Sequence, residues 1–166
     1  MPNRIRPRSL FSTRFWAIFA LAGAGIAVSS GLGGCQRHVS DARIEVITLA
    51  EAVEFYEDSV GSEPSAMFLD ARRDSIFAEG TIEGARQLRP DDVDLRADPD
   101  PKLEARDALI VFGQNPSSAV ARAMSKRLLQ AGYNSMLKAR VKFYPGGYDE
   151  WLATGLPVEI PEIEEE

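Results

Sequence analysis

The chain contains one cysteine, Cys35, and one histidine, His38, among its 166 residues. A disulfide within the chain is therefore excluded, because it needs two cysteines. A metal site of cysteine and histidine is unsupported, and so is a catalytic triad of serine, histidine and aspartate, because the only histidine lies in a short polar linker. The sequence thus predicts no metal and no cofactor.

Positive charge is scarce beyond the first 34 residues. The whole chain has a formal net charge of −6, and residues 1–34 hold four arginines and no acidic residue. Because those arginines carry +4, residues 35–166 carry −10. Nucleic-acid binding needs clustered lysine and arginine for phosphate contacts, so the acidic body predicts no nucleic-acid partner.

The N-terminal stretch has the order of an export signal. Met1–Arg14 is positive, Phe15–Val28 is apolar, and small residues follow up to Cys35. Leu32-Gly33-Gly34-Cys35 resembles the lipobox of bacterial lipoproteins. The resemblance implies that residues 1–34 are cleaved as a signal peptide and that Cys35 becomes a lipid-bearing N-terminus. Several acyl chains would then hold the protein stably on a membrane.

Two alternatives stay open for this segment. Phe15–Gly34 carries no charged side chain, and its length is just enough for an uncleaved helix to span a bilayer. Simple secretion without an anchor is the other alternative. All three place the rest of the chain outside the cytoplasm, facing the periplasm or the cell surface, because the arginines stay inside.

The stretch Ala108–Ala131 predicts a strand, a tight loop and a helix. Ala108–Phe112 is a continuous apolar run, typical of a parallel strand covered on both faces. A turn-forming cluster follows, with Asn115 expected as the helix cap and Pro116 as the first helical residue. Such a loop presents backbone N–H groups at the positive end of the helix dipole, which indicates an anion-binding site. The residues of this candidate loop are Gly113, Gln114, Asn115, Pro116, Ser117, Ser118 and Ala119.

Strands and helices alternate along the rest of the chain. Thr48 stands three residues before Glu51, which indicates a capping box at the start of a helix. Alternation of this kind predicts a parallel α/β sheet. Further strands are expected at Ile44–Ile47, Ala66–Leu69, Ala85–Leu88 and around Val141–Phe143.

Arg89–Lys102 is predicted to be a solvated acidic loop. Calcium is an alternative for its five aspartates, but their spacing does not fit an EF-hand loop and no glycine stands at the turn. These aspartates are Asp91, Asp92, Asp94, Asp98 and Asp100.

Lys138, Arg140 and Lys142 form a small basic group in the acidic body. The simpler interpretation is a solvated strand edge, where lysine opposes pairing with other strands. Val141 and Phe143 alternate with Lys142, as in a half-buried strand. Gln36–Arg43 is expected to be a polar linker.

Two groups of residues resemble the rhodanese-like family. The first is Asp70-Ala71-Arg72 followed by Phe77, Gly80, Ile82 and Gly84-Ala85, and the second is Gly146-Gly147 with Trp151 and Gly155-Leu156-Pro157. The resemblance covers residues 44–158 and implies a roughly five-stranded parallel sheet with helices on both faces. An acidic tail without fixed structure is then expected at 159–166. The residues taken as the structural motif are Asp70, Arg72, Gly80, Gly84 and Trp151.

The usual activity of that family is not expected here. In the family the central strand ends in a cysteine, whose thiolate takes up a sulfane sulfur as a persulfide. Gly113 falls at that position, Ser118 falls where the loop has an arginine, and Thr81 replaces a histidine. No catalytic residue is therefore assigned.

Three functions remain as hypotheses. The first is a membrane-anchored, non-catalytic module that binds a small oxyanion or a protein partner. The second is a thiosulfate-type sulfurtransferase with a non-standard site, for which Ser117 and Ser118 supply the only hydroxyl groups of the loop. The third is phosphate-ester chemistry, which in related loops also needs the cysteine and the arginine.

Overall fold

The computed structural model describes residues 38–134 and 139–162. The predicted signal peptide, Cys35 and Lys138 lie outside the described residues. Within the described ranges, no helix is long and apolar enough to cross a membrane.

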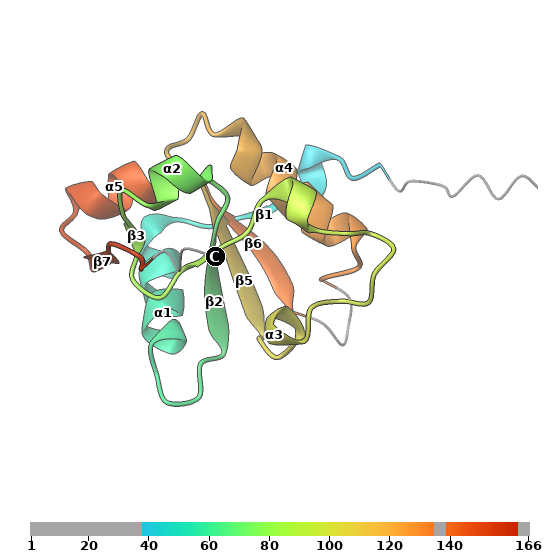
Figure 1. Ribbon diagram of the computed structural model, residues 1–166, viewed down its shortest axis with the longest axis horizontal. Coiled ribbons are helices and arrows are strands. Elements are labelled where there is room, and N and C mark those ends of the chain that lie inside the picture. The colour runs from blue at the N-terminus through green and yellow to red at the C-terminus, as the bar shows by residue number, and fades with distance from the viewer. Residues whose placement is uncertain (1–37, 135–138, 163–166) are drawn as a thin grey trace, which may run out of the picture. The chain divides into compact units, whose positions relative to one another are not determined.

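A five-stranded parallel sheet forms the centre of the domain (Figure 1). This architecture confirms the fold class predicted from the alternation of strands and helices. In spatial order the strands are β1 (Glu45–Val46), β6 (Arg140–Tyr144), β5 (Ala108–Phe112), β2 (Ala66–Asp70) and β4 (Arg86–Gln87).

Helices cover both faces of this sheet (Figure 1). On one face lie α1 (Leu49–Ser59) and α5 (Gly147–Ala153). On the other lie α4 (Ala119–Gln130), α3 (Pro101–Glu104) and two short 3₁₀ helices, η1 (Asp41–Arg43) and η2 (Pro90–Asp92). The remaining helix, α2 (Asp74–Phe77), follows β2.

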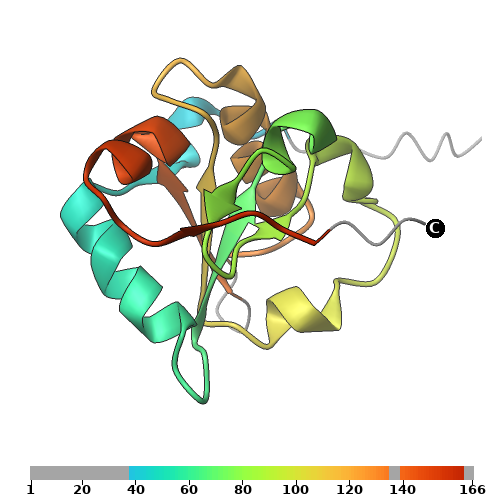
Figure 2. The same ribbon diagram turned by 60° about the vertical axis from the view of Figure 1, so that its left-hand side comes forward.

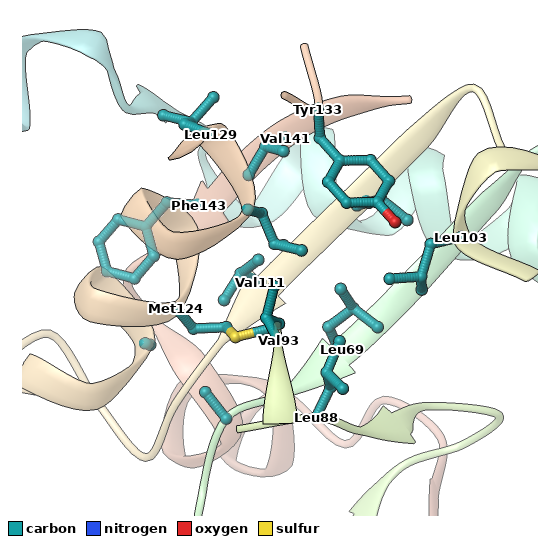
Figure 3. Close-up of a cluster of buried hydrophobic side chains, with 14 of the residues drawn as sticks. Leu69, Leu88, Val93, Leu103, Val111, Met124, Leu129, Tyr133, Val141 and Phe143 are labelled. Carbon is teal, nitrogen blue, oxygen red and sulfur yellow. The ribbon is translucent and has the colours of Figure 1, made fainter. Parts of the chain in front are cut away.

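Side chains of each central strand alternate between the two faces. In β5, Leu109 and Val111 point into the cluster beneath α4, whereas Ile110 and Phe112 point into the cluster beneath α1 and α5. Figure 3 shows the first cluster, which includes Met124 of α4 and Val111 of β5. Because both faces are buried, the strand reads as an unbroken apolar run.

Trp151 fixes α5 to the second cluster. Its ring is fully buried and packs against Tyr56 and Phe68 with ring centroids 5.3 and 5.6 Å apart. Its indole N–H donates to the carbonyl oxygen of Pro157 at 2.9 Å. The tryptophan therefore joins the last helix to the chain that leaves it.

Tyr56 extends this aromatic group toward the surface. Its hydroxyl donates to a carboxylate oxygen of Glu83 at 2.7 Å. Burial, the hydrogen bond and the charge of Glu83 disfavour the phenolate and raise the pKa of Tyr56 to about 12. The helix that carries Tyr56 begins as predicted, with the capping box of Thr48 and Glu51 in place.

The two ends of the domain differ from the predictions. The polar linker expected before residue 44 includes Val39, which is 2 % exposed and belongs to the cluster beneath α4. The expected tail begins with β7 (Val158–Glu159), which pairs antiparallel with β3 (Thr81–Ile82), as Figure 2 shows. Glu159 accepts from the backbone N–H of Gly84 at 3.0 Å. Val39 thus holds the first segment by burial, whereas hydrogen bonds hold the second, because Val158 is exposed.

A second correction concerns Lys142 and the strand that carries it. β6 lies between β1 and β5, so it is not the sheet edge that the sequence predicted. Lys142 is buried, forms an ion pair with Glu45 and lies 5.3 Å from the ring centroid of Phe55. Arg140 remains exposed.

The expected acidic loop at residues 89–102 is only partly irregular. It contains η2 and the start of α3, and Val93 between them is buried in the cluster beneath α4. Pro90 and Pro101 each stand at the first position of a short helix, where the missing N–H of proline has no cost.

The β3–β7 pair gives a stability prediction. A chain truncated after Pro157 loses β7, its pairing with β3 and the bond from Gly84, so we expect its free energy of unfolding to fall by on the order of 1 kcal/mol or more. A chain truncated after Pro161 keeps all of these contacts and is the matched control. Both truncations are made in the domain from Gln36 onward, where Trp151 is the only tryptophan of the sequence. Urea unfolding followed by its fluorescence measures both, and equal midpoints would contradict the prediction.

Candidate functional site

The candidate loop lies where β2 and β5 end side by side. Asp70 and Phe112 are opposite each other in the parallel register, and the N–H of Ala71 donates to the carbonyl oxygen of Phe112 at 3.1 Å. Carboxyl ends of parallel strands meet at one edge of a sheet, which is where binding sites in such folds form. The chain after Asp70 therefore runs beside the chain after Phe112.

Arg72 connects three segments at this edge. Its guanidinium binds the Asp70 carboxylate at 2.6 Å and donates to the carbonyl oxygen of Gly80 at 2.6 Å. It also donates to Oε1 of Gln114 in the candidate loop at 3.0 Å. Its carbon lies 4.2 Å from the ring centroid of Tyr148, a cation–π distance.

The Asp70–Arg72 pair is almost completely buried, with side-chain exposures of 0 and 4 %. Asp70 receives two further donors, the N–H of Arg72 at 2.9 Å and the hydroxyl of Thr81 at 2.8 Å. Thr81 thus serves as a hydrogen-bond donor to the aspartate. With every oxygen of Asp70 engaged inside the protein, this pair acts on the loop by holding it in place.

Gly113 has no room for a side chain. A Cβ atom built on its backbone would lie 2.6 Å from the Cβ of Ser118, closer still to the Ser118 hydroxyl, and 3.1 Å from the Cβ of Ala121. The side chain of Ser118 therefore fills the space into which a residue at position 113 would project. Gly113 and Ser118, which pack against each other in this way, belong to the same loop.

The candidate loop closes on itself through Asn115. The N–H of Ser117 donates to the side-chain Oδ1 of Asn115 at 3.1 Å. The N–H of Ser118 donates to the backbone carbonyl oxygen of Asn115 at 2.9 Å. The prediction that Asn115 caps the helix and that Pro116 is its first residue is therefore wrong. The side chain forms a local turn instead, which asparagine favours as readily as a cap. The helix α4 begins at Ala119, one turn later.

The carbonyl groups of the loop face the start of α5. The N–H groups of Tyr148 and Asp149 donate to the carbonyl oxygens of Gly113 and Gln114, each at 2.9 Å. Gly147 makes this approach possible, because a Cβ there would lie 2.5 Å from the Gly113 oxygen and its φ is +66°. Gly113 and Gly147 thus come together in the structure.

Asp149 is a site residue that the sequence analysis missed. Its carboxylate accepts from the side-chain amide of Gln114 and from that of Asn115, the latter at 3.2 Å. The carboxylate therefore holds both amide side chains of the loop. The available sequence signal was an acidic residue two positions after Gly147, in the first turn of a helix that follows a strand end.

A groove of about 420 Å³ lies beside the loop. Its wall is mainly apolar, and Val46 in it is 60 % exposed. The Glu150 carboxylate accepts from the Tyr144 hydroxyl at 2.8 Å, and burial together with this carboxylate raises the pKa of Tyr144. The apolar residues that line the groove are Val46, Ile47, Leu49, Pro116, Tyr144 and Pro145.

Three aspartates of residues 89–102, Asp92, Asp94 and Asp100, accept hydrogen bonds or form ion pairs within the protein. Asp100 forms an ion pair with Arg86 at 2.7 Å, and Asp92 accepts from the N–H of Arg89 at 2.8 Å. Among the described residues, no three histidine, cysteine, aspartate or glutamate side chains gather as metal ligands.

A family model for the rhodanese-like domain matches residues 52–154, which is more than half of the chain. The chain belongs to the rhodanese-like domain family. No curated protein matches the chain. The matched residues include the whole candidate loop and most of both buried clusters, except Val39 and Ile47.

Solved structures are similar in fold. The BH2092 protein from Bacillus halodurans has a TM-score of 0.53 at 17 % identity, covering 69 % of this chain and 76 % of that one. The RPA3614 protein from Rhodopseudomonas palustris has a TM-score of 0.51 at 19 % identity, covering 72 and 87 %. A thiosulfate sulfurtransferase from Pseudomonas aeruginosa has a TM-score of 0.48 at 18 % identity, covering 72 % of this chain and 21 % of that one.

Replacing Arg72 tests its part in holding the site. Arg72→Met leaves the buried Asp70 carboxylate without its cation, so we expect the free energy of unfolding to fall by about 3–5 kcal/mol. Arg73→Met alters the exposed neighbour and should change it by no more than about 0.5 kcal/mol. Denaturant unfolding of both variants is the measurement, and a small loss in Arg72→Met would show that Asp70 does not depend on this pair.

Proposed function

We propose that this rhodanese-like domain is exported, is held on a membrane by lipid on Cys35, has no sulfurtransferase activity and binds a protein partner beside the candidate loop. The observation that carries the proposal is the packing at Gly113. Position 113 bears no nucleophile, and the Ser118 side chain occupies the space in which one would stand.

Sulfur transfer needs a group that can hold the sulfur. A thiolate attacks a sulfane sulfur and keeps it as a persulfide, whereas a serine hydroxyl forms no such intermediate. Ser117 and Ser118 supply the hydroxyl groups of the loop. The only histidine of the chain, His38, belongs to the segment before η1. The alternative of a sulfurtransferase with a serine-based site therefore lacks both its nucleophile and its base.

The membrane anchor rests on the residue pattern before the domain. A positive stretch, an apolar stretch and Leu32-Gly33-Gly34-Cys35 stand in the order of a lipoprotein signal. A lipid anchor of this kind needs no spanning helix in the domain itself.

The surroundings of the loop favour a protein partner. The groove beside Pro116 is lined mainly by apolar residues, so apolar side chains of a protein segment can pack into it. Oxyanion binding is the second candidate, which the positive end of α4 at Ala119 favours. An oxyanion, however, would have to replace the bonds of Ser117 and Ser118 to Asn115 and lie near the Asp149 carboxylate.

Thiosulfate tests the absence of activity and the choice of ligand together. With thiosulfate and cyanide, the domain from Gln36 onward should form thiocyanate no faster than a blank without protein. In an NMR titration with thiosulfate, sulfite and phosphate, the amides of Gln114, Asn115, Ser117, Ser118 and Ala119 should show no saturable shift. Thiocyanate above the blank would refute the loss of activity, and saturable shifts confined to these amides would instead establish an oxyanion-binding loop.

A cysteine placed at position 113 tests the packing argument. Gly113→Cys collides with Ser118, so we expect a loss of stability of about 1–3 kcal/mol and no thiocyanate formation. The double variant Gly113→Cys/Ser118→Gly removes the collision and should regain stability. It should remain inactive, because the loop has no arginine and Pro116 lacks an N–H group. Activity in either variant at the rate of a catalytic family member would show that the loop is still competent.

A further inference from the structure

The chain is fixed to the domain almost directly after Cys35. Val39 is 2 % exposed and belongs to the buried cluster beneath α4, other members of which appear in Figure 3. The helix η1 follows at once, and its Asp41 forms an ion pair with Lys126 of α4. A buried side chain and an ion pair therefore attach the start of the domain to one face.

This attachment limits the reach of a lipid on Cys35. Four residue steps separate Cys35 from Val39, and a fully extended chain covers at most about 3.6 Å per residue, or about 14 Å in all. The thickness of the domain exceeds that reach, because helices cover both faces of the sheet and each helix with its side chains already measures about 10 Å across. The domain thus has little freedom to turn its other faces toward the membrane.

We propose that the domain lies on an anionic phospholipid surface in one orientation. This proposal rests on the proposed lipid on Cys35. The contact face consists of η1 with His38 and the α4 stripe of Ala119, Arg122, Ala123 and Lys126. Residues 119, 122, 123 and 126 follow the i, i+3, i+4, i+7 spacing and therefore share one side of the helix. Of these, Ala119, Arg122 and Ala123 are exposed.

The charge of this face fits that surface. Lys126 forms an ion pair with Asp41. This bond and the nearby Arg122 and His38 lower the pKa of the Asp41 carboxyl. Arg43, which lies on η1 together with Asp41, is exposed. Residues 35–166 carry −10 in total, so anionic headgroups repel most of the domain and attract this face. The attraction acts over about one Debye length, about 8 Å at physiological salt, which the short tether keeps within range.

The orientation also decides where the candidate loop stands. Arg122 donates to the carbonyl oxygen of Pro116 at 3.4 Å, so the loop adjoins the proposed contact face. A partner that binds beside Pro116 must therefore be reachable at the level of the headgroups. A protein embedded in the same membrane fits this position.

Two single-cysteine labels test the orientation. Lipid blocks the sulfur of Cys35, so a spin label attached to the lipidated full-length protein reacts only with an introduced cysteine. Ala123→Cys lies on the proposed face, and Ser62→Cys is exposed in the loop between α1 and β2, at the opposite end of β2 from Asp70 (Figure 1). The vesicles contain phosphatidylethanolamine, phosphatidylglycerol and a lipid with a nickel-chelating headgroup.

We expect nickel at the headgroups to relax the Ala123→Cys label several-fold more strongly than the Ser62→Cys label. Inserting a Gly/Ser linker of about ten residues between Gln36 and Arg37 should make the two relaxations similar, because the reach then exceeds the size of the domain. Equal relaxation in the protein without the insertion, or a stronger effect at Ser62→Cys, would overturn the proposed orientation. An unchanged difference after the insertion would show that the tether does not impose it.

A separate measurement distinguishes this failure from failure of the anchor. A lipidated protein floats with the vesicles and has the added mass of its acyl chains, whichever face it presents. If the protein carries that mass and floats but the two labels respond equally, the orientation is wrong and the anchor stands. Absence of the added mass refutes the anchor and, with it, the orientation.

Discussion

The buried ion pair between Asp70 and Arg72 is the interaction on which the geometry of the site depends. A buried charge is tolerated only when it is paired and hydrogen-bonded, and here the donors come from Thr81 and from the backbone of Arg72. The same guanidinium also donates to Gly80 and Gln114. One desolvated cation thus sets the positions of the β2 end, the turn before β3 and the candidate loop.

The candidate loop is also held by contacts other than Arg72. Its carbonyls bind the N–H groups of α5, its amide side chains bind Asp149, and its serines bind Asn115 or fill the space at Gly113. Each of these contacts uses a polar group that a reacting substrate would otherwise meet. The loop therefore contributes to the surface of the domain, and the groove beside Pro116 extends from the loop to Val46 of β1.

The sheet was predictable from the sequence because Ala66–Leu69 and Ala108–Phe112 are apolar runs that only two covered faces can bury. The turn at Asn115 was not, because an asparagine before proline suits a local turn and a helix cap equally well. Its bond to Asp149, a residue far along the chain, cannot be deduced from the local sequence. Lys142 was misassigned for a related reason. Alternation in one strand cannot reveal that Glu45 and Phe55, from other elements, surround the ammonium group.

Both outermost strands of the sheet, β1 and β4, are only two residues long. A long exposed edge strand presents a row of free backbone groups to which another chain can pair, and short edge strands reduce this hazard. On a membrane, proteins are confined to two dimensions, and neighbouring copies meet edge to edge far more often than in solution. For the membrane-anchored protein proposed above, the brevity of β1 and β4 would limit pairing between the edge strands of neighbouring copies.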